Sequence, residues 1–411
     1  MPPITPTVSG STTNSSHGRQ QSVEISHPFV YKYGRRYLRE IPEYPLPVDL
    51  AELHRQTLRT TLLLDVFGTP FSSRLGHPPE KVLEVLCGPA VWSLRCDQYL
   101  KQKGLKNVSF TGVDIAPLAP DLTKYGVNWR FVLHDIRKPP LPFAEEFDLI
   151  MVNDGTMALP SAKDVKTNPL TTLKKYLKPG GCIEVIETDY VFRCLQPEPA
   201  TAHGTNSKDA EQARKTATYT VGPATPFSKA QNRFFTDYNK WVEKALQEWD
   251  FTVTPCAVMS FGLSTERIGY EEVGSRRVAI PFSYIRWETD LESEFPMETD
   301  HRPEGKQTSR SKGLTKGSNP TKYAQPLTSD QAALRQTALN IAVGLIECLE
   351  PLLMKESGKK QDEWDRWWSA MMTDLFERNG TINGECLEAG VWWARKAGED
   401  EESETDSDQE E

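Results

Sequence analysis

The sequence predicts a doubly wound α/β fold with a mostly parallel sheet, and three observations carry that prediction. Between residues 80 and 190, short apolar runs alternate with more polar segments of helical length. The runs have no polar face, which is typical of strands in a parallel sheet covered by helices on both sides. Most of them end in an acid, at the edge of the sheet where ligands of such folds bind.

Five runs are expected to form the parallel strands: KVLEV (81–85), NVSFTGVD (107–114), NWRFVLHD (128–135), FDLIMVND (147–154) and CIEVIETD (182–189). Beyond them, the spacing of apolar residues predicts helices at 227–249, 329–356 and 361–379 and strands at 276–282 and 390–396. Five of the ten tryptophans lie between 364 and 393, at a spacing more typical of core packing than of a cofactor site.

Four stretches have the composition of disordered chain: residues 1–27, 197–225, 296–328 and the C-terminal tail. They are rich in polar residues, Gly or Pro and hold few large apolar groups. Such segments do not bury enough surface to offset the entropy of ordering them. The remainder is long enough for one elaborated α/β domain.

Charge and cysteine content exclude several classes of protein. The formal net charge of −9 comes from the tail 399–411, which carries nine acids and no base; without it, 48 bases face 48 acids. A neutral body gives no charge argument for nucleic-acid or membrane binding, and no apolar run is long enough to cross a bilayer. The seven scattered cysteines favour neither a disulfide framework nor a zinc site. We expect a protein of the cytoplasm or nucleus, because residues 1–20 do not resemble a secretory signal.

The strand ends suit a nucleoside that carries an amino-acid arm. An acid at the second strand end, Asp114, is placed to accept both ribose hydroxyls. Gly88 lets backbone approach a ligand closely, and Pro89 suits the first position of the following helix. Asp135 offers an acceptor for a purine amine beside the apolar Ile136. The alternative is that each acid only caps a turn.

These residues belong to motifs that resemble those of the class I S-adenosylmethionine-dependent methyltransferases. VLEVLCGPAVWSL resembles their first motif, FTGVDIAPLAP the second, and LKPGG before the fifth strand is a further signature. The resemblance implies a Rossmann-like methyltransferase fold, a methyltransferase activity and S-adenosylmethionine as the cofactor. It places the cofactor against Glu84, Leu86, Gly88, Asp114, Ile115, Asp135, Ile136, Asn153 and Asp154.

A narrower resemblance lies outside this core. YGRRYLREIPEYPLPVDLAELHRQ (33–56) is similar to the N-terminal signature of the fungal LaeA-like methyltransferases. It implies that Gly34–Tyr37 form a lid over the cofactor and that GVWWARK closes a seven-stranded sheet. It also implies a link to fungal secondary metabolism or its regulation.

The domain division expected is a tail (1–27), a helical lid segment (28–79), a core (80–290, with an insertion at 197–225), a linker (296–328), C-terminal helices with the closing strand (329–397) and an acidic tail (398–411).

Three departures from the first motif keep a second function open. Leu86, Pro89 and Ala90 stand where the family usually has Gly, Thr and Gly, so the alternative is an inactive scaffold that binds partners. A dinucleotide-dependent dehydrogenase is a poor third option, because the second and third glycines of its fingerprint are absent.

The methyl acceptor, a small molecule or a protein, is not encoded in any motif that we recognise. We assign no catalytic residue, because methyl transfer depends mainly on proximity and alignment. His134, the only histidine at a strand end, is either a general base or, as we favour, a polar neighbour of Asp135. The acidic tail is either a solubility segment or a docking arm for a basic protein partner.

Overall fold

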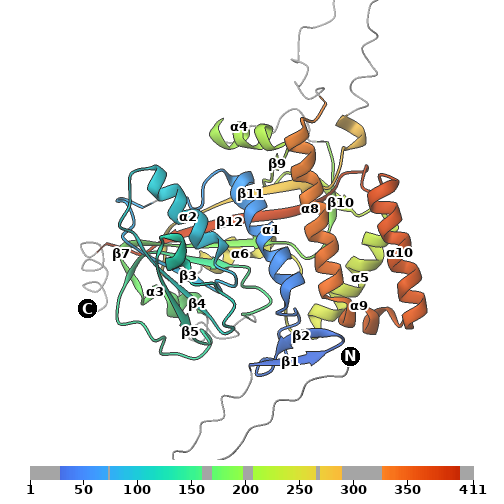
Figure 1. The fold of residues 1–411 in the computed structure, drawn as a ribbon. Helices are drawn as coiled ribbons and strands as arrows, with labels where there is room; N and C mark the ends of the chain where they lie inside the picture. Colours follow the sequence, from blue (N-terminus) through green and yellow to red (C-terminus); the bar gives the residue numbers. More distant parts are fainter. Residues whose placement is uncertain are drawn as a thin grey trace, which may run out of the picture.

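The computed structural model describes residues 28–72, 75–159, 169–197, 207–264, 269–288 and 326–398. One large sheet runs through the molecule, with helices on both of its faces (Figure 1). Helices α5, α8, α9 and α10 gather at the right of the view, away from the parallel strands. Disorder was also predicted at 1–27, at 399–411 and in the linker 296–328. These residues, apart from the end of the linker, lie outside the described residues.

The five expected parallel strands are present. They are β3 (Lys81–Val85), β4 (Ser109–Asp114), β5 (Asn128–Leu133), β6 (Phe147–Asn153) and β7 (Leu177–Thr188). They pair in the order β5-β4-β3-β6-β7. The chain therefore reverses direction across the sheet between β3 and β6, and ligands of open α/β sheets bind at the carboxyl ends beside such a switch point.

The strand predicted at 390–396 is β12 (Glu385–Arg395), which lies antiparallel between β7 and β11 (Glu271–Pro281). The count of seven strands is wrong, because the described sheet has ten. The additional strands are β8 (Arg193–Leu195), β9 (Tyr219–Thr220) and β10 (Phe227–Lys229). Strand β8 pairs with β12, β9 pairs with β11, and β10 pairs with β8. Each has only two or three residues, which is too short to show a hydrophobic period in the sequence.

Within segment 197–225, residues 207–225 are folded, which corrects the expectation of disorder for them; residues 198–206 lie outside the described residues. The folded part forms α4 (Ser207–Thr216) and β9. Helix α4 buries Ala213 and is tied to its neighbours by polar contacts. The amide Nε2 of Gln212 donates to the carbonyl of Asp65, and Arg276 Nε lies 3.2 Å from Asp209 Oδ1. Contacts with distant residues stabilise what the local composition alone does not.

The remaining helices are α1 (Leu50–Phe67), α2 (Val91–Gln102), α3 (Pro169–Lys174), α5 (Arg233–Gln247), α6 (Pro255–Leu263), α8 (Ser329–Cys348), α9 (Glu350–Ser357) and α10 (Gln361–Glu377), with a 3₁₀ turn at Leu122–Tyr125. The helix expected over 329–356 is divided into two helices, α8 and α9. Pro351, near the start of α9, has no N–H to continue α8.

Among the described residues, no single helix has the length and hydropathy of a membrane span. Helices α8 and α9 meet these criteria only when taken together, and this pair is bent by 67°.

The tryptophans of the C-terminal helices are core residues, as expected. Trp364 and Trp367 of α10 stack with ring centroids 5.0 Å apart, and Trp241 of α5 packs against both. Trp392 of β12 is fully buried. This aromatic cluster joins the C-terminal helices to the rest of the domain.

The N-terminal segment begins with a two-stranded hairpin, β1 (Phe29–Lys32) and β2 (Arg35–Leu38). Residues 39–48 follow it. From here on, these residues and Leu38, the last residue of β2, are called the lid segment, which is shorter than the stretch 28–79 expected from the sequence. Leu38, Ile41 and Val48 of the lid segment pack on Ala116, just after β4. The residues expected to form a lid, Gly34–Tyr37, lie instead at the hairpin turn and in β2.

Candidate functional site

A cavity lies at the carboxyl ends of β3, β4, β5 and β6, against the lid segment. All nine residues expected to contact a cofactor line it: Glu84, Leu86, Gly88, Asp114, Ile115, Asp135, Ile136, Asn153 and Asp154. They come from four separate strand ends, and the parallel sheet brings these ends to one edge. Their individual roles stay predictions.

The turn after β3 adopts left-handed backbone conformations that are typical of glycine, although two of the residues concerned are not glycines. Leu86, Gly88 and Ala90 all have positive φ, at 57°, 47° and 55°. A left-handed conformation costs an L-residue roughly 1–2 kcal/mol. Ala90 is the N-cap of α2, so Pro89 precedes the helix and the expectation that it would be the first helical residue is wrong. The turn therefore stores strain at the cavity wall.

Glu84 is buried at the base of this turn. Its Oε2 accepts hydrogen bonds from the backbone N–H and the hydroxyl of Ser93, at 3.2 and 2.6 Å. Its Oε1 accepts from Asn153 Nδ2 at 2.8 Å, which joins the ends of β3 and β6. Burial raises the pKa of Glu84 to about 8, against the opposing effect of these donors.

Asp114 holds the two loops on either side of it. Its Oδ2 accepts from the N–H of Gly88 and its Oδ1 from the N–H of Ala116, both at 2.9 Å. Burial raises the pKa of Asp114. Each oxygen keeps a second lone pair, so the carboxylate retains the capacity to accept two hydroxyl hydrogens.

The carboxylate of Asp135 already binds neighbouring cations, which we did not expect. Arg137 binds it with two parallel bonds, Nε to Oδ1 and Nη2 to Oδ2, both at 2.9 Å, and Lys138 Nζ lies 3.5 Å from Oδ2. These cations and the hydrogen bonds from Arg137 lower the pKa of Asp135, although its burial acts in the opposite direction. Any amine that binds here shares the carboxylate with Arg137.

His134 lines the same cavity beside Asp135. Its Nε2 lies 3.0 Å from the backbone carbonyl of Lys138, a contact that requires a proton on that nitrogen. With Nε2 donating, Nδ1 is left as the acceptor of the ring, so the role of His134 as a polar neighbour of Asp135 stays a prediction.

The N-terminal resemblance predicted a cover over the cofactor, but not the residues that form the upper wall of the cavity. The lid segment contributes Leu38, Ile41, Tyr44 and Val48, and α1 contributes Gln56, Arg59 and Thr60. One signal was present for α1. Arg55 and Arg59, four residues apart, fall on the same helix face as the buried Leu62 and Val66. Arginines in an apolar stripe are paired when buried. Arg55 pairs with Glu52, with Nε 2.7 Å from Oε2, and Arg59 lines the cavity.

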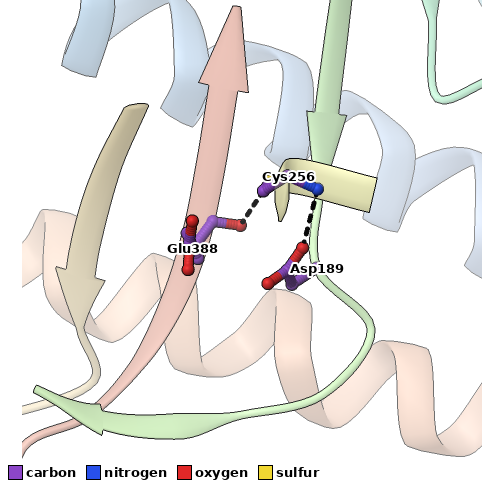
Figure 2. Close-up of side chains that lie close together, drawn as sticks. All are labelled: Asp189, Cys256 and Glu388. Carbon is purple, nitrogen blue, oxygen red and sulfur yellow. Dashed lines mark hydrogen bonds between the residues drawn. The ribbon is translucent and has the colours of Figure 1, made fainter. Parts of the chain in front are cut away.

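Three other side chains of ligand type meet behind the sheet, and Figure 2 shows them. Asp189 follows β7, Cys256 begins α6 and Glu388 lies in β12. The N–H of Cys256 donates to Asp189 Oδ1 at 2.9 Å. Two guanidinium groups neutralise the carboxylates, because Arg193 contacts both and Arg277 Nε donates to Glu388 at 2.9 Å. Burial raises the pKa of the Cys256 thiol well above 9. The cluster is a buried ion-pair network that joins three elements.

Comparison with known proteins identifies the segment that carries the site. Residues 82–181 match the model of a family described as a methyltransferase domain. The match supports the enzyme class expected from the sequence, a methyltransferase. The match covers β3 to the first part of β7 and so contains all nine of the predicted cofactor residues.

Solved structures similar to the chain include further methyltransferases. The plantazolicin methyltransferase BpumL, in complex with a monoazolic desmethylPZN analog and SAH, is 10% identical over 84% of this chain and 87% of that chain, with a TM-score of 0.34. The N-methyltransferase NodS from Bradyrhizobium japonicum WM9, in complex with S-adenosyl-l-homocysteine, is 18% identical over 42% and 78%, with a TM-score of 0.24.

The CMeT domain of the citrinin polyketide synthase is 17% identical over 27% of this chain and 29% of that chain, with a TM-score of 0.23. All three scores are low, and the fold assignment rests on the strand order and the family match instead. No curated protein matches the sequence significantly.

Proposed function

We propose that the cavity under the lid segment binds S-adenosylmethionine and that the chain transfers its methyl group to an acceptor. The observation that carries this proposal is the convergence of nine predicted contact residues from four strand ends on one cavity. Asp114 accepts the ribose hydroxyls, and Ile115 and Ile136 contact the two faces of the adenine. Glu84 and Asn153 lie toward the amino-acid arm.

The transfer needs alignment more than acid or base chemistry. S-adenosylmethionine bound here would supply an electrophilic methyl group on its sulfonium, and the acceptor would supply the lone pair that takes it. Held in line, the two reactants gain the large advantage of an intramolecular reaction. Tyr44 lines the cavity, and burial raises the pKa of its hydroxyl well above 10. It therefore acts as a hydrogen-bond donor that orients a ligand and not as a base.

We further propose that the protein is LaeA-like, with an acceptor linked to fungal secondary metabolism or its regulation. The support is the similarity of residues 33–56 to that group, and these residues include the lid segment and the part of α1 that faces the cavity. The acceptor class, small molecule or protein, stays open. The cytoplasm or the nucleus is the proposed location.

Titration calorimetry of the full-length protein with S-adenosylmethionine and S-adenosylhomocysteine tests the proposal. We expect micromolar binding of both. Asp114→Ala should weaken binding by about 10–100-fold, because charge-assisted hydrogen bonds are worth about 1.5–3 kcal/mol. Asp121→Ala is the matched control, since Asp121 only caps the exposed 3₁₀ turn nearby. Melting temperatures of both variants show whether the loss is one of binding or of folding.

The scaffold alternative predicts a different pattern. The side chain of Leu86 lines the cavity, where it crowds a ligand in the first turn. A folded wild type without affinity, whose binding is restored by Leu86→Gly with Ala90→Gly, would be a methyltransferase fold that lost its cofactor at this turn. If neither protein binds while both remain folded, the proposed function is wrong.

A further inference from the structure

The carboxylate of Asp135 has little acceptor capacity left for a ligand. A carboxylate offers about four lone-pair positions, two on each oxygen. Its Oδ1 accepts from the backbone N–H of Arg137 at 3.1 Å and from Nε of the same residue at 2.9 Å, and its Oδ2 accepts from Nη2 at 2.9 Å. Lys138 adds a second cation, with Nζ 3.5 Å from Oδ2. A new donor therefore gains a strong bond to Asp135 only if a present one moves away.

The donor that is free to move is the guanidinium of Arg137. The backbone around it is fixed as a turn, because the N–H of Lys138 donates to the carbonyl of Asp135 at 2.9 Å and His134 Nε2 lies 3.0 Å from the carbonyl of Lys138. The side chain of Arg137 is partly exposed, in contrast to its backbone N–H, which belongs to the turn. A ligand can therefore displace the two guanidinium bonds and leave the turn intact.

Arg137 also has a second anion within reach. Its Nη1 donates to Oε1 of Glu43, in the lid segment, at 3.0 Å. A guanidinium that leaves Asp135 therefore keeps a charged partner, which lowers the cost of the displacement. Asp135, Ile136 and Arg137 all line the cavity. A purine that packs on Ile136, as proposed above, thus meets an acidic acceptor and a basic donor on neighbouring residues.

Purines differ in what they offer to such a pair. Adenine carries an amine at its six-position, which donates to a carboxylate and must displace the guanidinium to do so. Hypoxanthine carries an oxygen there, which accepts from a guanidinium that stays in place and is repelled by a bare carboxylate. Arg137 on Asp135 therefore reduces the advantage of the amine and also the disadvantage of the oxygen.

We propose that Arg137 competes with the purine amine of the cofactor for Asp135, and so reduces the selection of adenine over a 6-oxopurine. When adenine binds, the guanidinium leaves Asp135 and stays with Glu43 on the lid segment. This inference rests on the proposed function. It makes Arg137 a specificity-determining residue, which acts on the base and not on the reacting atoms.

Calorimetry with two ligands tests the inference. They are S-adenosylhomocysteine and S-inosylhomocysteine, in which an oxygen replaces the purine amine. The quantity measured is the selectivity ratio, the Kd of the inosyl ligand divided by that of the adenosyl ligand. Arg137→Met removes the competing donors, so the ratio should rise by about three- to tenfold.

Glu43→Gln should move the ratio in the opposite direction. It leaves a displaced guanidinium without its second anion, so adenine binding becomes harder and the ratio should fall, by no more than about fivefold. Arg130→Met is the matched control. Arg130 is an exposed arginine of β5 that pairs with Glu145, and its loss should leave the ratio within about twofold of wild type.

A purely structural role of Arg137 in holding the lid segment would change both affinities equally and leave the ratio unaltered. A ratio that does not rise in Arg137→Met, or does not fall in Glu43→Gln, overturns the inference. A wild type that already excludes S-inosylhomocysteine overturns it too, and in each of these cases the proposed function stands. Melting temperatures show which variants fold, and if Arg137→Met does not, the ratio in Glu43→Gln decides alone. If the folded wild type binds neither ligand, the proposed function itself fails.

Discussion

Glu84 shows how a single buried carboxyl can link cofactor binding to pH. Burial raises its pKa to about 8, so it is mostly protonated at pH 7. An ammonium placed nearby favours the ionised form and lowers that pKa, so binding releases a proton. Affinity for S-adenosylhomocysteine should therefore rise as the pH increases from about 6 to 8.

Calorimetry across that pH range, in buffers with different ionisation enthalpies, measures both the affinity and the proton released. Glu84→Gln keeps the shape of the side chain and removes the titration, so its affinity should be nearly flat with pH. An equally steep profile in this variant would assign the proton to another group, such as Asp114, whose pKa burial also raises.

Ala90 tests whether the first turn is strained. The residue is fully buried and has a φ of 55°. Glycine relieves a left-handed strain of roughly 1–2 kcal/mol but loses a buried methyl group and makes the unfolded chain more flexible. We expect Ala90→Gly to change the free energy of unfolding by less than about 1 kcal/mol.

Ala389→Gly is the control for that substitution, because Ala389 is equally buried but lies in the regular strand β12. It should cost more, about 1–2 kcal/mol, since no strain is relieved. Urea unfolding of the two variants compares them. Equal losses would show that the turn at Ala90 is unstrained.

At the scale of elements, the lid segment is tied to the sheet by one ionic bridge. Arg137, after β5, donates to Glu43 of the lid segment at 3.0 Å while its other nitrogens bind Asp135. The Glu43–Arg137 pair is partly exposed, at 43% and 24%, and such pairs are worth about 0–1 kcal/mol. Glu43→Gln should therefore speed S-adenosylhomocysteine dissociation by no more than about fivefold.

Stopped-flow binding and amide hydrogen exchange over residues 38–48 provide the two readouts for Glu43→Gln. Exchange there should also become faster. Glu145→Gln is the control, because it breaks exposed pairs with Lys81 and Arg130 away from the lid. Unaltered exchange in Glu43→Gln would show that the apolar contacts of Leu38, Ile41 and Val48 hold the lid without the bridge.

The elements that could be predicted differ physically from those that could not. Each parallel strand is a continuous apolar run whose burial on both faces is written into its own residues. Strands β8 to β10 are only two or three residues long and helix α4 is mostly polar, and partners far away in the sequence stabilise them. Their existence depends on tertiary contacts that no local pattern records.

For the molecule as a whole, the site also combines residues that could be predicted from the sequence with residues that could not. The strand-end residues could be predicted because a parallel sheet brings its carboxyl ends to one edge. Arg59 and the lid segment come from outside that repeat. The N-terminal resemblance predicted a lid, but the residues that line the cavity are known only from the folded chain. The occupation of Asp135 by Arg137, two residues away, depends on a side-chain conformation that the spacing alone does not determine.

The acidic tail is expected to act on the whole molecule through charge and not through stability. Residues 399–411 hold nine acids and no apolar residue, so their deletion changes the formal net charge from −9 to 0. The melting temperature of the deletion variant should stay within about 1–2 °C of wild type, because the tail has nothing to bury. Its solubility near pH 7 should fall, since molecules without net charge no longer repel one another. Replacing the nine acids by their amides, at unchanged length, should reproduce the loss of solubility. Turbidity against protein concentration and differential scanning fluorimetry measure the two effects, and a drop of many degrees would instead show that the tail stabilises the fold.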